Sequence, residues 1–555
     1  MKKKLRIGVL LDSNEIPAWS YTMLESINAS LSGEIVLIIK NKAGKDDKKG
    51  FLKRIFKKRK AILFFFFRKI EKMVFKINPD AFEVKDIRDI LSIDTIEVNP
   101  VKTKFRDIFN ESDVNKIQNY NIDILIRMGF RILSGDILKI AKHGIWSFHH
   151  GDNKVNKGGP AGFWEVFQNW SETGVILQIL TEDLDGGIIL QKSFSSTDRL
   201  SPIKNKNNYY WKALSFLPAK IDELYYLGEE VFFKRVDEMN LHPQFYSNRL
   251  FTSPTNKEMI TLGSKLVFNY ISRRVNSIFY FEQWVLLFRL SPTNGISKSF
   301  FQYKKIIPPK DRFWADPHVI QKNDKYYIFV EELLYSTNKG HISLIVMDNK
   351  GNYSKPTIVL EKEYHLSYPF LIEDNGELYM IPETKNNNTI ELYKCTSFPL
   401  KWEFEKVLID NIAAVDSTIT YKDGKYWLFA NVVRNKGASS LDELFLFYSD
   451  KLVSKNWTSH PQNPIISDVK QSRPAGSFFI YNENLYRPSQ NSSKRYGYGM
   501  RINQILELSE TNYQEKVIDS IYPNWERRLL STHTINSTNN LSVIDALIKR
   551  RKYFY

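Results

Sequence analysis

The chain has 555 residues, of which 43% are hydrophobic and 14% aromatic, so it is long enough to build more than one packed domain. Its single cysteine, Cys395, excludes a framework of internal disulfides and fits a reducing compartment. Lys and Arg outnumber Asp and Glu by 79 to 62, and the formal net charge of +17 indicates an anionic partner without choosing among a membrane, a nucleic acid and a phosphorylated sugar.

The first residues are typical of the opening strand of an α/β domain. The apolar run Ile7–Leu11 is short and ends at Asp12, so it predicts a strand and not a signal peptide. Gly8 and the polar residues after the run mark the first turn of a doubly wound sheet. A helix over 17–30 and a second strand over 34–40 follow.

A basic and aromatic insertion occupies residues 41–76. Lys and Arg crowd positions 42–60, ahead of the apolar run Ala61–Phe67. This run of seven residues is too short to cross a bilayer, which takes about 20 residues in a helix. We expect a pair of helices with a solvated basic face in a cytoplasmic protein. The alternative is a patch that lies on an anionic membrane surface, at the inner face of the membrane.

The first half contains residues suited to proton transfer. The run Ile122–Ile126 is typical of a buried parallel strand, and the next strand, predicted over 144–148, ends at His149. Ligands of open α/β sheets bind at the carboxyl ends of the strands. A further strand over 174–180 precedes Asp185, which lies in a turn with two glycines. One helix and one strand separate His149 from Asp185, so both side chains can reach one crevice.

Four motifs stand in order along this segment. They are the run GFRILS from Gly129, the strand ending at His149, the Gly-Gly-Pro turn at 158–160 and the Leu-Asp-Gly-Gly turn at 184–187. The set resembles the formyltransferase domain that uses 10-formyltetrahydrofolate, shared by glycinamide ribonucleotide, methionyl-tRNA and nucleotide-sugar formyltransferases. The resemblance covers most of residues 1–200 and implies a Rossmann-like α/β domain there, with 10-formyltetrahydrofolate as cofactor.

The resemblance also assigns roles to residues. His149 would be the general acid and base, and Asp185 would orient its imidazole. The family's asparagine, which donates a hydrogen bond to the developing oxyanion, is replaced by Ser147, with His150 as a second donor nearby. The residues around the pteridine would be Gly129, Phe130, Arg131, Ile132 and Leu133. Two versions stay open: an active enzyme with an altered oxyanion site, and a degenerate domain that keeps the pocket without turnover.

The pattern changes twice after residue 200. Residues 201–278 predict a helical connector without an assignable motif. From 279 to 555, apolar and polar residues alternate, and five similar segments recur, each with an apolar strand, an Asn/Asp/Gly turn and an aromatic strand. The segments start at Ala315, Ser367, Val415, Ser472 and Ser531. Their spacing leaves room for four strands each, so this half predicts an all-β, five-bladed propeller.

The innermost strands of a propeller line its central channel, so the first polar residues of the repeats should converge there. The expected sugar-binding side chains are Asp316, Asp416, Arg473 and His533, with Glu383 at a strand end. This half resembles the furanosidase-like propellers of arabinan- and xylan-cleaving glycosidases, and Asp316 matches the position of their base. The second repeat has Ser367 and Tyr368 where an aspartate would stand. Because glycoside hydrolysis needs two positioned carboxylates, a carbohydrate-binding propeller is favoured, and no metal site is predicted.

The two halves together predict an enzyme that transfers a formyl group from 10-formyltetrahydrofolate to the amine of a nucleotide- or lipid-linked amino sugar, in surface polysaccharide synthesis. The alternatives are a catalytically degenerate carbohydrate-binding protein and a glycosidase or glycosyltransferase that works through the propeller. A methionyl-tRNA formyltransferase would carry a small β-barrel after its catalytic domain, which is not the pattern here. Nucleic acid is therefore not an expected partner.

Overall fold

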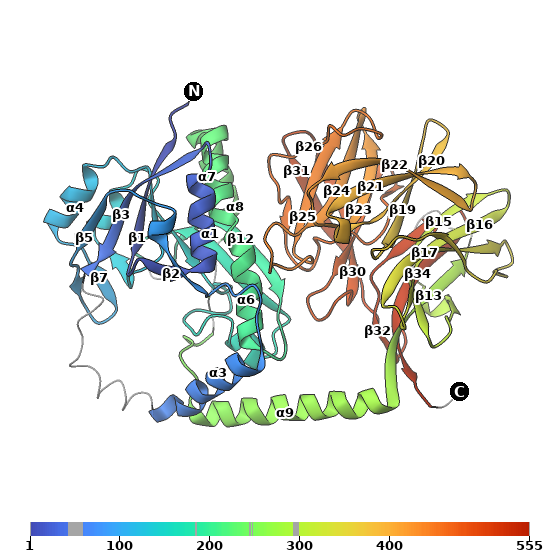
Figure 1. Ribbon diagram of the computed structural model, residues 1–555, viewed down its shortest axis with the longest axis horizontal. Helices are drawn as coiled ribbons and strands as arrows, with labels where there is room; N and C mark the ends of the chain where they lie inside the picture. The colour runs from blue at the N-terminus through green and yellow to red at the C-terminus, as the bar shows by residue number, and fades with distance from the viewer. Residues whose placement is uncertain are drawn as a thin grey trace. The chain divides into compact units, whose positions relative to one another are not determined.

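The computed structural model describes residues 2–42, 59–183, 186–242, 246, 248–291 and 299–553. These residues form two compact units (Figure 1). Unit 1 comprises Met1–Val267 with Arg434–Ser439, and unit 2 comprises Phe268–Val433 with Ser440–Tyr555. The predicted change from an α/β first half to an all-β second half is confirmed at this level.

Unit 1 is built on a seven-stranded sheet. Its strands are β1 (Leu5–Leu11), β3 (Gly33–Asn41), β5 (Thr95–Val98), β8 (Ile124–Arg127), β10 (Ile145–His149), β11 (Glu172–Ile179) and β12 (Ile188–Ser196). They lie in the order β12-β11-β10-β8-β1-β3-β5, with parallel pairing from β10 to β5 and antiparallel pairing of β11 and β12. The chain order reverses at β1, and in open α/β sheets the carboxyl ends of the strands at such a point are where ligands bind.

Helices cover both faces of this sheet (Figure 1). The helices are α1 (Ala18–Asn28), α3 (Ile62–Val74), α4 (Glu111–Gln118), α5 (Trp164–Phe167), α6 (Pro202–Ala213), α7 (Phe216–Leu227) and α8 (Glu229–Asn240). Of these, α3 and α5 pack in a separate cluster, through Phe64 and Trp164. One core joins Trp19 of α1 and Phe232 of α8 to Trp146 of β10, and a second joins Val114 and Ile117 of α4 to the other face. Short strands β2 (Glu15–Pro17) and β4 (Val84–Asp86) pair with each other, and β6 (Val101–Lys102), β7 (Arg106–Ile108) and β9 (Ile132–Ser134) form a small sheet.

The helix α9 (Asn256–Phe279) follows α6, α7 and α8 in the segment that the sequence predicts as a helical connector. Its 24 residues carry buried Met259 and Leu262 near the start, and many exposed apolar side chains follow. Across the residues described here, no helix combines the length and the apolar character that a bilayer crossing requires.

Unit 2 consists of five antiparallel sheets along the chain. The first contains β13 (Tyr280–Leu290), β14 (Lys304–Ile306), β32 (Leu529–Ser531), β33 (Ile535–Thr538) and β34 (Leu541–Arg551). The second contains β15 (Arg312–Lys322), β16 (Lys325–Leu334), β17 (Lys339–Asp348) and β18 (Thr357–Leu360), and the third β19 (Ser367–Asp374), β20 (Glu377–Glu383), β21 (Thr389–Ser397) and β22 (Lys401–Asp410). The fourth contains β23 (Ala414–Lys422), β24 (Lys425–Val432), β25 (Glu443–Ser449), β26 (Thr458–Ser459) and β27 (Ile466–Ser467), and the fifth β28 (Phe479–Tyr481), β29 (Asn484–Asn491), β30 (Gly499–Leu508) and β31 (Tyr513–Ile521).

Apolar cores join each of these sheets to the next. Separate clusters link the first sheet to the second, the second to the third, the third to the fourth and the fourth to the fifth. Another cluster, with Ala475, Met500 and Ile544, links the fifth sheet back to the first. The series is therefore closed, and its first sheet contains both β13 and β34, which pair antiparallel from Tyr280 and Arg551 to Leu290 and Leu541.

Candidate functional site

Three strands of unit 2 share an irregularity close to their first residues. In β15, β19 and β23 the pairing register shifts between Ala315 and His318, between Ser367 and Phe370, and between Val415 and Thr418. The bulged residues Asp316, Tyr368 and Asp416 have φ angles of 51°, 45° and 52°. β-Bulges redirect side chains, and left-handed backbone in such residues persists only where the surrounding structure holds it. All three side chains are buried.

Asp416 is held by a buried arginine. Arg473 donates from Nε to Oδ2 at 2.5 Å and from Nη2 to Oδ1 at 3.0 Å, a two-pronged pair of the strong kind. Gln490 Nε2 donates to the same carboxylate at 2.8 Å. Glu383 Oε2 lies 3.6 Å from Arg473 Nη2. Burial raises the pKa of Glu383 to about 8, even though Arg473 lowers it, so this carboxyl keeps its proton at neutral pH.

A second group surrounds His533. Its Nδ1 lies 2.6 Å from Asp545 Oδ2, and its Nε2 lies 3.5 Å from Asp316 Oδ1. Thr534 Oγ1 donates to Asp316 Oδ1 at 2.7 Å. Burial opposes a charge on the imidazole, but Asp545 and Asp316 outweigh it and raise the pKa of His533. Burial also raises the pKa of Asp316, although His533 lowers it.

Aromatic rings lie between the two groups, and one of these rings is exposed to solvent. The Tyr496 ring lies 5.1 Å from Arg473 Cζ and 5.2 Å from the His533 ring, and Trp284 stacks on His533 at 4.1 Å. Tyr496 is 41% exposed, whereas Asp416 is 1% and Arg473 7% exposed. We call Asp316, Glu383, Asp416, Arg473, Tyr496, His533 and Asp545 the central cluster. It places buried charges beneath an exposed ring, which suits a ligand with both hydroxyl groups and an apolar face.

The central cluster also contains a set of groups that metals favour. One ligand atom each from Asp316, His533 and Asp545 lies within 4.8 Å of the others. These carboxylate and imidazole groups fit a divalent cation. In their present arrangement they bind one another, and a charged imidazole would offset one of the two carboxylate charges.

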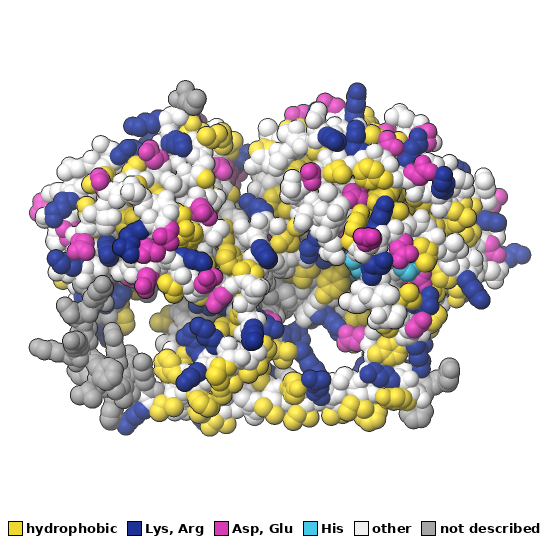
Figure 2. Space-filling model, in the orientation of Figure 1, with side chains coloured by type: hydrophobic (Ala, Val, Ile, Leu, Met, Phe, Trp, Pro, Cys, Tyr) yellow, Lys and Arg dark blue, Asp and Glu magenta, His cyan; other side chains and the backbone are white. Residues whose placement is uncertain are grey.

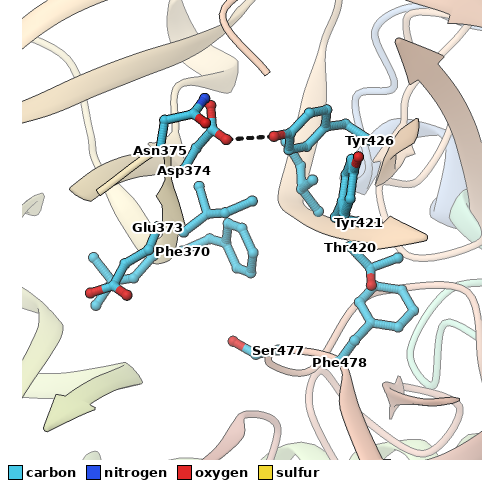
Figure 3. Close-up of a pocket in the computed structure, with 12 residues that line it drawn as sticks. Phe370, Glu373, Asp374, Asn375, Thr420, Tyr421, Tyr426, Ser477 and Phe478 are labelled. Atoms are coloured by element: carbon cyan, nitrogen blue, oxygen red, sulfur yellow. Dashed lines mark hydrogen bonds between the residues drawn. The ribbon is translucent and has the colours of Figure 1, made fainter. Parts of the chain in front are cut away.

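A separate pocket lies at the far ends of β19 and β23 from Tyr368 and Asp416 (Figure 3). Its volume is about 540 Å³. Figure 3 shows Asp374 facing Tyr426, whose hydroxyl donates to Asp374 Oδ1 at 2.6 Å, with Tyr421 and Phe478 nearby. No residue predicted from the sequence as functional lines it.

The residues predicted for unit 1 have partners within their own fold. Ser147 is 2% exposed and accepts a hydrogen bond from Arg127 Nη1 at 3.2 Å. His149 Nε2 lies 3.1 Å from the carbonyl oxygen of Asn156. His150 stacks on Tyr210 at 3.9 Å, and burial lowers its pKa well below 6.5, so it is neutral at neutral pH. Asp185 lies outside the described residues.

The segment proposed for a pteridine is similarly occupied. A side chain at Gly129 would meet the backbone of Asp12, and Phe130 N donates to Asp12 Oδ1 at 3.0 Å. Arg131 pairs with Asp107, with 2.7 Å between Nη2 and Oδ1. Ile132 and Leu133 belong to β9. The polar groups of this segment are therefore bound to unit 1 itself.

Sequence reasoning missed several residues of the central cluster. Asp545 is a single aspartate within the apolar run of β34, and this contrast was its signal. Tyr496 and Trp284 lie outside the repeated strand starts, so no periodic pattern marks them. In unit 1, Glu165 was also missed: it accepts a hydrogen bond from Asn156 at 2.7 Å, and burial raises its pKa to about 7.

Comparison with known proteins gives different results for the two parts of the chain. Residues 305–529 match the family model described as "Glucosamine inositolphosphorylceramide transferase 1, N-terminal". A protein of that name from Oryza sativa subsp. japonica is 36% identical over 206 residues, which is 37% of this chain and 27% of the relative. A methionyl-tRNA formyltransferase from Prochlorococcus marinus is 33% identical over 117 residues, 21% of this chain and 32% of that protein.

Solved structures share less with the chain. A family 117 glycoside hydrolase of Zobellia galactanivorans has a TM-score of 0.32 and 12% identity, and the match covers 48% of this chain and 90% of that protein. The chain spans about a quarter of the length of the curated transferases that it matches, 27% by alignment.

These comparisons correct the predicted chemistry. The prediction of formyl transfer to an amino sugar is wrong, and with it the prediction of 10-formyltetrahydrofolate as cofactor. The relatives that match over 206 residues are named as sugar transferases, while the formyltransferase match is limited to 117 residues. In the structure, Ser147 and His149 are also engaged by Arg127 and Asn156. The glycosyltransferase alternative agrees better with these findings.

Proposed function

We propose that unit 2 is a five-bladed propeller that binds the sugar in a glycosyl-transfer reaction. One observation carries the proposal: the segment 305–529, which matches a sugar-transferase family model, includes four predicted channel residues that come together in the central cluster. They are Asp316, Glu383, Asp416 and Arg473. The closed series of sheets supports the propeller, and the reversal of strand order at β1 supports a Rossmann-like unit 1.

The relatives' name suggests the substrates. Glucosamine would be the sugar and inositolphosphorylceramide the acceptor. An amino sugar offers hydroxyl groups and an ammonium group, and the central cluster offers carboxylates, a guanidinium group and a protonated carboxyl. Charge-assisted hydrogen bonds of this type are stronger than neutral ones. The exposed Tyr496 ring would contact the apolar face of the sugar.

Glu383 is our candidate for proton transfer at this site. Glycosyl transfer removes a proton from the acceptor hydroxyl as the new bond forms, and the leaving group gains negative charge. A buried carboxyl with a pKa near neutrality is suited to giving or taking a proton. The raised pKa of Glu383, about 8, puts it in this range.

Glu383→Gln tests the proposal with little change in shape. The full chain would be incubated with inositolphosphorylceramide and nucleotide-linked glucosamine, and glucosamine binding would be followed by NMR saturation transfer. We expect Glu383→Gln to lose transfer, and Glu391→Gln to behave as the parent. Glu391 is a matched control, since it is also buried but bonds to Tyr393 and Tyr364 instead of the central cluster. Equal activity of the two variants would contradict the proposal.

A sugar-binding role without transfer is the second candidate. It is favoured by the coverage of the match, because the family model is described as N-terminal and the chain spans 27% of the relatives. Binding of glucosamine that depends on Glu383, with no transfer by the parent chain, would select this candidate.

We also propose that α3 lies on an anionic membrane, which would bring the protein to a lipid-linked acceptor. Its exposed apolar residues follow the helical period on one side, with Ile62 56%, Phe66 61% and Met73 66% exposed. Glu71 lies on the opposite side of the helix and is buried. Its Oε1 accepts hydrogen bonds from Ser201 Oγ at 2.7 Å and from Ile203 N at 2.9 Å, which attach α3 to the rest of unit 1. The basic flank of α3 consists of Arg68, Lys69 and Lys72.

This arrangement supports an interfacial helix, since its apolar side faces outward beside basic residues. The rest of the predicted basic patch, residues 43–58, lies outside the described residues. Cosedimentation with phosphatidylcholine vesicles, with and without phosphatidylserine, tests the contact. Equal binding to vesicles with and without phosphatidylserine would contradict the proposed contact of α3 with an anionic membrane.

A further inference from the structure

Unit 2 contains a strongly basic pocket outside the central cluster. Its volume is about 760 Å³. The charged side chains that line it are Lys305, Lys310, Arg528, Lys549, Arg550 and Arg551, with Glu526 as the acidic one. Six positive charges and one negative charge therefore surround one cavity. Ile307, Pro309 and Ile548 supply an apolar part of its wall.

Two of these cations donate to neutral groups. Lys549 Nζ donates to the Asn276 side chain at 2.7 Å, and Arg550 Nη1 donates to the carbonyl of Pro308 at 3.0 Å. These acceptors are neutral. Lys305 pairs with Glu526 at 2.5 Å. Among the described residues, Arg528 and Arg551 have no carboxylate partner within ion-pair distance. Like charges held this close repel one another, and a bound polyanion would relieve the repulsion.

The pocket adjoins the end of α9. The bond from Lys549 to Asn276 joins β34 to this helix, and Lys552 N donates to the carbonyl of Phe279 at 3.0 Å. The last turns of α9 expose apolar side chains on one face, with Ile271 53%, Val275 48% and Ile278 55% exposed. Figure 2 shows hydrophobic side chains gathered along α9. The last turns of α9 and the cavity rich in cations are therefore neighbours in unit 2, and the helix contacts β34 through Asn276 while its apolar residues stay exposed.

We propose that this pocket binds the phosphate-bearing headgroup of an anionic lipid, whose acyl chains lie against the exposed apolar face of α9. The guanidinium group of arginine can donate two parallel hydrogen bonds to two oxygens of one phosphate, and lysine contributes a compact positive charge. The apolar residues of α9 suit the acyl region beside the headgroup, as in helices that lie in the membrane interface. The inference extends the proposed membrane contact from α3 to a specific lipid site in unit 2, and it involves no residue of the central cluster.

The test uses the full chain with two probes. The first is phosphatidylcholine vesicles containing phosphatidylinositol, and the second is soluble inositol 1-phosphate, measured by calorimetry. The variant Arg528→Gln/Arg551→Gln removes two charges from the pocket. The control Lys350→Gln/Lys516→Gln removes two charges from exposed positions of unit 2 that do not line it. We expect the pocket variant to lower vesicle affinity about tenfold or more, and the control to change it little.

A third variant separates the lipid from a free phosphate compound. Ile271→Ser/Val275→Ser should weaken vesicle binding while leaving inositol 1-phosphate binding unchanged. Equal vesicle binding by the pocket variant and its charge control would overturn the inference. The inference would also be overturned if the parent binds inositol 1-phosphate but the pocket variant and the α9 variant both bind vesicles as tightly as the parent. If Ile62→Ser/Phe66→Ser loses vesicle binding while the pocket and α9 variants keep it, the membrane contact runs through α3 and the lipid site in unit 2 is overturned.

Discussion

Both units contain histidines that contact other side chains or the backbone, yet their surroundings differ. In unit 1, His150 stacks on Tyr210 with its pKa lowered by burial, and His149 bonds to a backbone carbonyl. In unit 2, His533 lies between two carboxylates, and its pKa is raised. The first environment stabilises the neutral form of the His150 ring, whereas the second concentrates charge around His533. The position of a histidine at a strand end is therefore not enough to predict a functional site. The groups that contact its ring must also be known.

The largest expected effect comes from breaking the buried pair of the central cluster. Arg473→Met leaves Asp416 buried without its guanidinium, which should lower the free energy of unfolding of unit 2 by about 3–5 kcal/mol. Chemical denaturation would measure the change. In unit 1, the exposed pair of Lys142 and Glu229, 2.6 Å apart, provides the comparison, because Lys142→Met should cost at most about 1 kcal/mol. Similar losses in both variants would remove the contrast between the units.

The pH dependence of stability should differ in sign between Glu383 and His150. Because burial raises the pKa of Glu383 from 4.5 to about 8, the folded chain keeps a proton that the unfolded chain has lost between these values. Its contribution is complete below pH 4.5 and is lost as the pH rises toward about 8. The lowered pKa of His150 acts the other way, and its contribution is lost as the pH falls below 6.5.

Denaturation over a series of pH values would separate these contributions. Glu383→Gln should flatten the decline on the alkaline side, and His150→Phe should flatten the decline on the acid side. Asp316, His533 and Glu165 also have raised pKa values, so a decline at high pH should persist in part. Curves for Glu383→Gln that run parallel to the parent would show that this carboxyl does not titrate as described.

A moderate effect is expected at the exposed ring of the central cluster. Tyr496→Ala should weaken glucosamine binding roughly three- to tenfold, since an aromatic contact contributes about 0.5–1.5 kcal/mol. Titration by NMR would measure this. Tyr421→Ala is the control, because Tyr421 is also exposed but lies in the pocket at the other ends of β19 and β23. A larger loss for Tyr421→Ala would move the sugar site to that pocket.

The smallest effect on stability is expected for α3. Ile62→Ser/Phe66→Ser changes exposed side chains, so the free energy of unfolding should stay within about 0.5 kcal/mol per residue. Vesicle binding should nevertheless fall, because these residues would contact the membrane. Phe64→Ser offers the contrast: Phe64 is 2% exposed and packs on Phe163, so its replacement should destabilise unit 1 instead.

The sequence predicted unit 2 better than unit 1 for a physical reason. Turns such as Asn323-Asp324, Asn375-Gly376 and Asp423-Gly424 recur, and all have positive φ at the turn residues. Repetition made the strand starts, and hence Asp316 and Asp416, visible without any knowledge of contacts. Tyr496 stayed hidden because its role depends on packing between sheets and on no local pattern.

In unit 1 the motifs indicated the strands and turns but not the chemistry. The carbonyl that engages His149 belongs to Asn156, in a loop whose path no periodicity specifies. Arg127 reaches Ser147 across neighbouring parallel strands, a pairing that depends on strand order. Local motifs therefore predicted the fold class and placed the histidine at a strand end, while the long-range partners that decide its use could not be read from them.

The pairing of β13 with β34 has a consequence for synthesis. β13 emerges from the ribosome early in unit 2, but its partner is made only after more than 250 further residues, since Tyr280 pairs with Arg551 and Leu290 with Leu541. The second to fifth sheets can form before the closed series of sheets is complete. Until β34 is made, the edge of β13 that pairs with it stays unpaired. A nascent chain halted before Leu541 would therefore present an unpaired strand to chaperones, and closure of the ring would be a late and long-range step of folding.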